Sequence, residues 1–229
     1  MSNLTWFLEG NLHREFTPRR MLIVYETSIP SDIIISFKAP KELVIKSSRP
    51  DVLFKKDDIY FWRPSRDVRF IDGRISYLYS IHLNVGGSFL SENLKCKVEN
   101  KVYGENHPYK NLKIRYLFSY KELDNVRLII GPFKPFITIL EKPRGSLRRW
   151  NIQGIGEVYF LTFDVLPSSL DIEYKLPKYI SSVVAARIEG ESQCPTGMEI
   201  KVLNANNLEE IKSLEGKGRI IAYLEDLFL

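Results

Sequence analysis

Apolar and polar residues alternate along several segments of this chain of 229 residues, and the pattern predicts β-strands. The longest alternating segments run from residue 75 to 85 and from residue 112 to 120. Their apolar positions recur at every second residue, as Ile75, Tyr77, Tyr79, Ile81, Leu83 and Val85, and as Leu112, Ile114, Tyr116, Phe118 and Tyr120. Strands with one apolar and one polar face are typical of antiparallel sheets in sandwiches and barrels.

Shorter apolar runs add further expected strands, and prolines separate many of them at a spacing typical of turns. These strands are Leu4–Leu8, Met21–Thr27, Ile33–Phe37, Leu43–Lys46, Val126–Ile130, Phe136–Leu140, Leu170–Leu176, Ser182–Ile188 and Met198–Leu203. Only one helix is expected, Leu208–Glu215, with Asn206 or Asn207 as its N-cap. The pattern of the terminal segment 219–229 fits both a helix and a strand.

A strand-turn-strand pattern that contains a tryptophan occurs twice. In the clearer copy, Trp150 is followed by a glycine-rich turn and by the apolar run Val158–Val165. In the looser copy, the strand Asp58–Trp62 is followed by a polar loop and by the strand that begins at Ile75. Each copy predicts a strand that ends on a buried tryptophan, then a connection and a longer strand. The repeat indicates two modules of the same kind.

The polar, turn-rich stretch Gly104–Pro108 separates the two copies and is the expected domain boundary. We therefore expect an all-β chain of two tandem antiparallel β-sandwiches, over residues 1–106 and 107–229, the second with a small C-terminal α/β appendage. Modules of about 100 residues have the size of immunoglobulin domains. A single larger two-sheet fold of jelly-roll or arrestin type is the structural alternative.

The tryptophan pattern resembles the immunoglobulin-like repeats of archaeal and bacterial surface and structural proteins. The second half matches the repeat through Trp150, Gly156-Glu157 and the alternating strand that follows. In the first half, Asp72-Gly73 stands in place of Gly-Glu, and residues 166–229 lie outside the resemblance. The resemblance implies sandwich modules that act as spacers, adhesion units or assembly subunits rather than as enzymes.

Composition refines this picture. The net charge is +5, hydrophobic residues make up 44% of the chain and charged residues 27%, as in ordinary globular proteins. Scarce glutamine beside abundant lysine and glutamate favours a thermophilic source, and an archaeal or viral assembly would suit the same residue usage. The sequence shows no signal-peptide pattern and no apolar stretch long enough to span a membrane, so we expect a cytoplasmic protein.

No known catalytic, cofactor or metal-binding motif occurs in the sequence. Cys96 and Cys194 are the only cysteines, and their separation favours ordinary buried thiols over a disulfide. The acidic pairs Asp57-Asp58 and Asp171-x-Glu173 lack the pattern of a calcium loop, and the first is expected to form a turn. We expect no cofactor and no metal. A hydrolase whose carboxylates meet only in the folded chain is the least favoured alternative.

Basic residues cluster beside both tryptophans. The first cluster lies in the loop after Trp62, around Phe70, and contains Arg63, Arg66, Arg69 and Arg74. The second lies just before Trp150 and contains Lys142, Arg144, Arg148 and Arg149. Arginine interleaved with aromatic residues can bind phosphates and stack on bases. Because both tryptophans are expected in a sandwich core, a solvated loop or a rim for protein contacts is favoured over contacts with nucleic acid.

The sequence therefore predicts a non-catalytic structural or adaptor protein. It would associate with other proteins, or with itself, through the edges of its sheets and its loops, because long strands leave edges that invite pairing. A nucleic-acid-binding protein that uses the arginine-rich loops is the alternative. Its affinity would fall steeply with salt.

Overall fold

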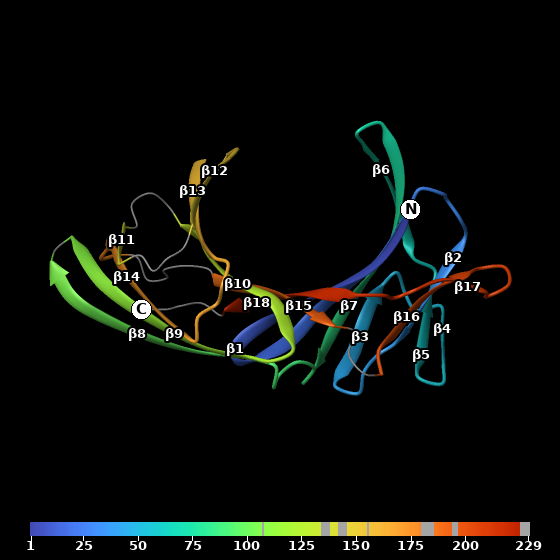
Figure 1. Ribbon diagram of the computed structural model, residues 1–229, viewed down its shortest axis with the longest axis horizontal. Coiled ribbons are helices and arrows are strands. Elements are labelled where there is room, and N and C mark those ends of the chain that lie inside the picture. Colours follow the sequence, from blue (N-terminus) through green and yellow to red (C-terminus); the bar gives the residue numbers. More distant parts are fainter. Residues whose placement is uncertain are drawn as a thin grey trace. The chain divides into compact units, whose positions relative to one another are not determined.

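The computed structural model describes residues 1–106, 108–133, 138–141, 146–154, 156–179, 186–193 and 197–224. In these residues the chain forms strands, turns and irregular segments, and no helix (Figure 1). The strands in chain order are β1 (Ser2–Thr27), β2 (Ile33–Lys38), β3 (Leu43–Arg49), β4 (Phe54–Lys56), β5 (Ile59–Trp62), β6 (Ser65–Ile71), β7 (Arg74–Gly87), β8 (Leu94–Asn106), β9 (Tyr109–Tyr120), β10 (Leu123–Phe133), β11 (Thr138–Glu141), β12 (Ser146–Ile152), β13 (Gly156–Phe163), β14 (Ser169–Pro177), β15 (Ala186–Gln193), β16 (Glu199–Asn204), β17 (Glu210–Ser213) and β18 (Lys217–Leu224).

The prediction of a chain rich in β-strands is confirmed, and both long alternating segments lie within single strands, β7 and β9. Two expected strands, Phe136–Leu140 and Ser182–Ile188, begin outside the described residues, and β11 and β15 cover their later parts. The ambiguous segment 219–229 is a strand as far as Leu224. No helix that could cross a membrane occurs in the described part of the chain.

The helix expected over Leu208–Glu215 is wrong, because this segment turns back into strand β17. Asparagine side chains cause the turn. The backbone N–H of Asn206 donates to Oδ1 of Asn204 at 2.8 Å, and Leu208 adopts a left-handed conformation with φ of 59°. Asparagine side chains that bind nearby backbone N–H groups favour turns over helices. The predicted α/β appendage is therefore a β-hairpin of β16 and β17 in this region.

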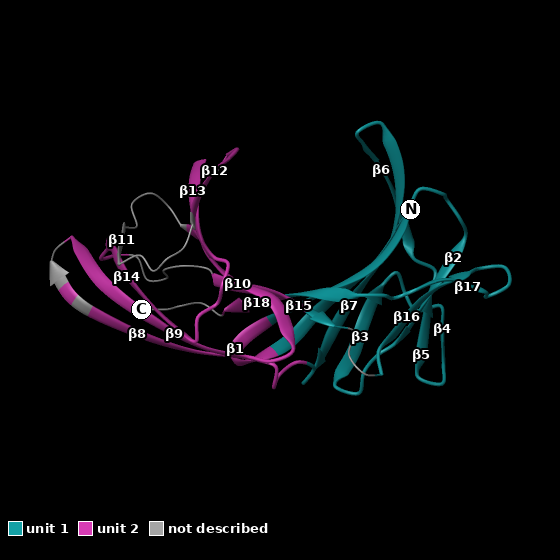
Figure 2. Cartoon of the chain, viewed as in Figure 1, with its two compact units in different colours: residues 1–10, 17–89, 192–220 teal, residues 11–16, 90–191, 221–229 magenta. Residues whose placement is uncertain are grey.

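The chain divides into two compact units (Figure 2). Three strands, β1, β15 and β18, contribute residues to both of them. Because single strands contribute residues to both units, the boundaries of these units differ from those of the expected domains 1–106 and 107–229. Unit 1 contains Met1–Gly10, Thr17–Phe89 and Ser192–Ile220, and unit 2 contains Asn11–Phe16, Leu90–Glu191 and Ile221–Leu229.

In unit 1, strand β7 pairs antiparallel with three other strands. Its residues Tyr77–Asn84 pair with β1, and its opposite edge pairs first with β6 and then with β3. A separate sheet has the strand order β17–β16–β2–β5–β4. The apolar positions of β7 from Tyr79 to Val85 are buried, as the alternation predicts, whereas Ile75 is exposed. Strand β7 thus begins in solvent and continues into the core.

Unit 1 also contains a close contact between β1 and β18, which are neighbours in the sheet. Trp6 on β1 is fully buried, and a Cβ atom at Gly218 on β18 would overlap its indole ring. Any larger residue at this position would force the ring or the strand to move, and displacing a packed aromatic side chain is costly. The glycine at position 218 is therefore required by packing.

In unit 2, strand β9 pairs antiparallel with β8 and β14. The predicted alternation is confirmed from Leu112 to Phe118, where the apolar residues at every second position are buried, whereas Tyr120, the last residue of the predicted series, is exposed. Tyr116 and Tyr174 are among the largest buried side chains, and burial raises the pKa of both phenols, so these groups are neutral core residues. Strand β13 pairs with β10 and β12. These pairings do not confirm the finer prediction of two tandem immunoglobulin-like sandwiches.

Candidate functional site

The segment after Trp62 is a β-hairpin rather than the polar loop that we expected. Strand β6 pairs with the first half of β7 in a continuous register that closes with Ile71 opposite Arg74. The two residues between them, Asp72 and Gly73, have φ values of 51° and 75°. Positive φ at both central positions is the geometry of a two-residue hairpin turn, and Asp-Gly is one of the sequences that favour it. We call residues 65–80 the β6 hairpin.

The end of the β6 hairpin lies in solvent. All seven residues of β6 are exposed, and among the described strands β6 pairs only with β7. The pairing of β7 with β1 ends at Tyr77, so beyond this residue the hairpin is a ribbon of two strands (Figure 1). One edge of β6 thus presents backbone N–H and C=O groups that no described strand pairs with. Such an edge is a template for another strand.

One face of the β6 hairpin is apolar. The register places Val68 opposite Tyr77 and Phe70 opposite Ile75. Side chains of directly opposite residues lie on the same face of a sheet, so these four residues form one patch. Val68 is 60% exposed and Phe70 is 71% exposed, which is unusual for adjacent apolar positions on one strand face. The patch and the open edge of β6 together form the candidate functional site.

A second edge strand in unit 1 does not combine an open edge with an apolar patch as exposed as that of β6. Strand β4 also has a single partner in its sheet and carries the exposed Phe54. The ring of Phe54 stacks on Phe61 with 4.4 Å between the ring centroids, and the Lys55 ammonium lies 4.9 Å from the centroid of Tyr60. The ring of Phe54 is therefore covered in part by neighbouring side chains and is 41% exposed, whereas Phe70 of the β6 hairpin is 71% exposed.

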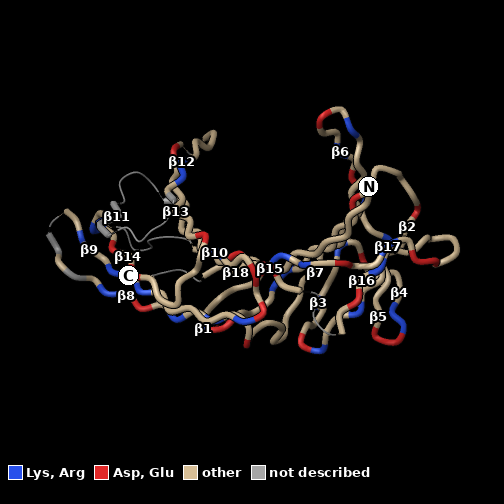
Figure 3. The backbone as a smooth tube through the Cα atoms, in the orientation of Figure 1, with Lys and Arg blue, Asp and Glu red and all other residues tan. Residues whose placement is uncertain are grey.

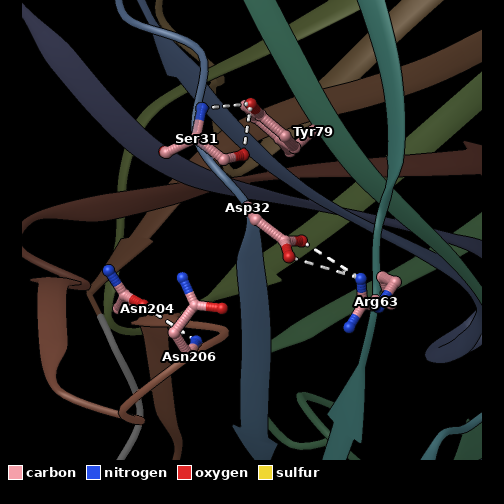
Figure 4. A network of polar contacts seen from close by, with 6 residues as sticks. All are labelled: Ser31, Asp32, Arg63, Tyr79, Asn204 and Asn206. Atoms are coloured by element: carbon pink, nitrogen blue, oxygen red, sulfur yellow. Dashed lines mark hydrogen bonds and ion pairs between the residues drawn. The ribbon is translucent and has the colours of Figure 1, made fainter.

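The structure separates the members of the first basic cluster. Arg63 pairs with Asp32, its Nη1 lying 3.2 Å from Oδ1 (Figure 4). Arg66, Arg69 and Arg74 form no ion pair with a described residue. By the alternation of β6, Arg66 lies on the face of Val68, while Arg69 lies on the opposite face with Arg74. Acidic positions interrupt the basic ones along the hairpin (Figure 3). The cluster does not form one basic surface.

The second basic cluster is described only in part, because Lys142 and Arg144 lie outside the described residues. Arg148 and Arg149 are successive residues of β12 and so lie on opposite faces of that strand. The Nε of Arg149 lies 2.8 Å from Oε1 of Glu157 on the neighbouring strand. Arg148 makes no ion pair with a described residue.

The prediction that Trp150 is buried is wrong, whereas the same prediction for Trp62 is confirmed. Trp62 is 0% exposed, and its Nε1 donates a hydrogen bond to Oγ of Ser48 at 3.0 Å. Trp150 is 58% exposed and meets Phe160 edge to face, with 6.3 Å between the ring centroids. Strand β12 is the last strand in its sheet order and pairs only with β13 among the described strands. Trp150 therefore lies on a strand at the margin of its sheet.

Three of the four acidic residues singled out in the sequence, Asp57, Asp58 and Asp171, have structural roles. Asp57 and Asp58 form the turn between β4 and β5, as expected, with φ values of 52° and 63°. Asp171 accepts hydrogen bonds from Arg115 at 2.7 and 3.0 Å, and these bonds lower the pKa of its carboxyl group. No group of three or more residues that could hold a metal ion occurs in the described part of the chain.

A further carboxylate, Glu189 on β15, is better shielded from solvent. Burial acts to raise the pKa of this group, but hydrogen bonds from Arg187 and Arg127 hold it below its ordinary value. A general acid needs the opposite shift, toward neutrality of the carboxyl group. Asp171 and Glu189 are thus neutralised by arginines, and neither has the environment of a catalytic acid.

The cysteines offer no reactive site in the described residues. Cys96 is buried and forms no disulfide with a described residue. Burial raises the pKa of its thiol to about 12, so the thiolate needed for nucleophilic chemistry is scarce at neutral pH. The burial of Cys96 agrees with the expectation of an ordinary core thiol. Cys194 lies outside the described residues.

Comparison with known proteins gives limited guidance. No family model matches the chain, and no curated protein is significantly similar to it in sequence. Among solved structures, the yeast delta-COP-I mu-homology domain in complex with a Dsl1 WxWxV peptide has a TM-score of 0.42 and 10% sequence identity, covering 98% of this chain and 95% of that one. The Fcho1 mu homology domain of Danio rerio with a bound Eps15 peptide has a TM-score of 0.36 and 7% identity, covering 96% and 92%. At these TM-scores, neither likeness carries an argument about this chain.

Proposed function

We propose that this protein is a non-catalytic structural or adaptor protein that assembles with other proteins through an open strand edge. The observation that supports the proposal is the β6 hairpin, whose unpaired edge lies beside the exposed apolar side chains of Val68 and Phe70. Main-chain hydrogen bonds along such an edge supply affinity, and side chains on alternate positions supply specificity. A partner strand would satisfy the peptide groups of the edge and place its own side chains beside Val68 and Phe70.

The charges of β6 make this edge selective. Edge strands of soluble proteins commonly carry charged residues, which oppose indiscriminate pairing. β6 has Arg66, Asp67 and Arg69 beside its apolar residues, and no described residue forms an ion pair with any of them. A partner strand with complementary charges would pair with them, whereas a strand with mismatched charges would be repelled. The proposal therefore involves a specific partner rather than general adhesion.

Site-specific photo-cross-linking in the cells that produce the protein tests this proposal. A photoreactive amino acid replaces Val68 in one variant and Val165 in another; Val165 is also an exposed valine but lies outside the strands. We expect defined covalent adducts with protein from position 68 and none of the same adducts from position 165. Equal labelling at both positions, or none at position 68, would contradict the proposal.

Nucleic-acid binding is the second candidate function, and one observation favours it. The exposed indole of Trp150 lies on the same face of β12 as Arg148, which has no ion-pair partner among the described residues. An aromatic ring beside a free arginine can stack on a base while the cation binds a phosphate. The described part of the surface around it does not extend this pair into a basic groove, so we rank the function second.

Tryptophan fluorescence separates the two candidates. Trp6 and Trp62 are fully buried, so quenching by a short single-stranded oligonucleotide would report on Trp150. If the protein binds nucleic acid, quenching should weaken steeply with salt and be lost in Arg148→Ala but be retained in Arg74→Ala. If fluorescence does not respond to the oligonucleotide at low salt, the nucleic-acid function is wrong.

A further inference from the structure

We infer that the partner strand is β6 of a second copy of this chain, paired antiparallel about a two-fold axis that passes through Val68. This inference rests on the proposed function, in which the open edge of β6 is the contact surface. It adds the identity of the partner and the register of the pairing. Three properties of β6 point to this arrangement: the direction of its peptide groups, the order of its charges and the position of its apolar residues.

The hairpin turn determines which peptide groups point to the open edge. Residues that flank a two-residue turn exchange both ladder hydrogen bonds, and along an antiparallel pair such positions alternate with positions that do not. Since Ile71 and Arg74 flank the turn, Ile71, Arg69 and Asp67 direct their N–H and C=O groups toward β7. Arg66, Val68 and Phe70 direct theirs to the open edge. A second β6 strand can therefore be hydrogen-bonded about Val68.

In this register the charges of β6 complement themselves. When Val68 lies opposite Val68 of the copy, Asp67 lies opposite Arg69 of the copy, and the symmetry creates this pair twice. These are the positions at which the two strands do not exchange hydrogen bonds, where side chains of opposite residues are closest. Opposite charges that face each other across a strand pair stabilise it. A two-fold interface requires such self-complementarity, since each side presents the same residues.

The neighbouring registers lack this complementarity. Among those that keep the open-edge peptide groups in phase, pairing centred on Asp67 places two aspartates opposite each other, and pairing centred on Arg69 places two arginines opposite each other. Pairing centred on Arg66 has the same defect, and pairing centred on Phe70 leaves most of the strand unpaired. Like charges that face each other destabilise a strand pair. Val68 is thus the centre that uses the strand fully without repulsion.

The same register joins the two apolar patches. Opposite residues share a face, so Val68 and Phe70 of one copy lie on the same side as Val68 and Phe70 of the other. Phe70 lies opposite Arg66 of the copy, where a guanidinium can stack over the exposed ring. The result is a sheet of four strands, β7–β6–β6–β7, with one continuous apolar stripe. In the pair, Val68 and Phe70 gain apolar and aromatic-cation neighbours from the copy on their own face, and these neighbours cover part of the exposed side-chain surface.

Charge reversal tests the register. Asp67→Arg places arginine opposite Arg69 of the copy, and Arg69→Asp places two aspartates opposite each other. Each change should weaken dimerisation by about tenfold or more, and the double variant Asp67→Arg/Arg69→Asp should restore it, because the pair is re-formed in reverse. Asp164→Arg is the control for net charge, since this exposed residue lies outside the strands of unit 2. Sedimentation velocity over a series of concentrations measures the dissociation constant, and circular dichroism checks the fold.

Cysteine pairing tests the two-fold axis directly. A cysteine at position 68 faces its own copy, so Val68→Cys should form a disulfide-linked dimer on mild oxidation. Asp67→Cys and Arg69→Cys should not link to themselves, but a mixture of the two variants should, because these positions face each other. The unsubstituted protein, run in parallel on non-reducing gels, controls for the native cysteines.

The outcomes are decisive. A dimer that is weakened by either charge reversal, restored by the double reversal and linked through position 68 supports the inference. A protein that is monomeric at every concentration overturns the inference. So does a dimer whose dissociation constant is unchanged in both charge-reversal variants. Cross-linking at Val68 distinguishes this failure from failure of the proposed function. Adducts with a different protein would leave the edge as a contact surface and replace only the partner, whereas no adduct in a monomeric protein would reject both.

Discussion

The two tryptophan strands have similar sequences around them but different surroundings. Trp62 ends β5, which lies between β2 and β4 in its sheet, and its side chain is fully buried. Trp150 lies near the end of β12, which has a single described neighbour, and its side chain is largely exposed. Both strands show the same local pattern. The difference teaches that a strand pattern reports the conformation of the backbone, while the burial of a side chain depends on how many strands and which layers surround it.

The largest expected effect comes from removing the buried ring. Trp62→Ala should lower the free energy of unfolding by about 3–5 kcal/mol, because it leaves a cavity and removes the packing of the indole. Chemical denaturation monitored by circular dichroism measures the change. If Trp62→Ala and Trp150→Ala lower the free energy of unfolding by similar amounts, the two rings have equal roles in stability and the proposed difference between them is wrong.

Gly218→Ala probes the third tryptophan, Trp6, without changing the ring. The added methyl group would overlap the indole, and overpacking of this kind should reduce the free energy of unfolding by about 1–3 kcal/mol. Gly154→Ala is a contrasting control because a Cβ atom there meets no atom within 4 Å, although its positive φ carries a strain of its own. If Gly218→Ala leaves the free energy of unfolding unchanged, the close packing of Gly218 against Trp6 does not contribute to stability.

Ser48→Ala tests how much the hydrogen bond of the buried Trp62 contributes to stability. It removes the acceptor of the Nε1 hydrogen bond while leaving the ring in place, and should cost about 1 kcal/mol. Thermal unfolding of the variant beside Trp62→Phe, which also lacks the donor, should show that the two changes are not additive. An additive double variant would mean that the hydrogen bond does not couple these residues.

The smallest effect is expected at the exposed ring. Trp150→Ala should change the free energy of unfolding by less than about 0.5 kcal/mol, as surface substitutions usually do. Acrylamide quenching of the parent protein should be dominated by one accessible tryptophan and should largely disappear in this variant. Destabilisation as large as that of Trp62→Ala would indicate that Trp150 is covered in solution.

The sequence predicted the positions of the strands well, but it predicted poorly how far their apolar faces are buried. Alternation located the buried faces of β7 and β9, because period-two patterns follow directly from strand geometry. It extended the buried face of β7 to Ile75, since periodicity does not show where the neighbouring strand β1 ends. The helix expected at Leu208–Glu215 failed because the side chains of Asn204 and Asn207 accept backbone hydrogen bonds from Asn206 and Glu209 and so form turns instead.

The candidate site was present in the sequence but was misread. Asp72-Gly73 between two short apolar runs is a hairpin signal, and we interpreted it as a variant of the Gly-Glu turn. That interpretation placed the arginines in a loop and hid the strand that carries Val68 and Phe70. No pattern in the chain indicates which edge of a sheet lacks a partner, because this depends on pairings between distant segments. The thermophilic, archaeal or viral source expected from composition stays a prediction.

Strand β1 has a consequence for how this protein can be divided experimentally. Its 26 residues pass from unit 1 into unit 2 and back again, and β15 and β18 also contribute to both. No contiguous gene fragment encodes all the residues of one unit without residues of the other. Truncation removes residues from both units once it passes Gly10 from the N-terminal side or Ile221 from the C-terminal side, so longer deletions would damage both together. A cut inside the exposed Asp72-Gly73 turn interrupts no described strand, and that turn is where the chain can be split.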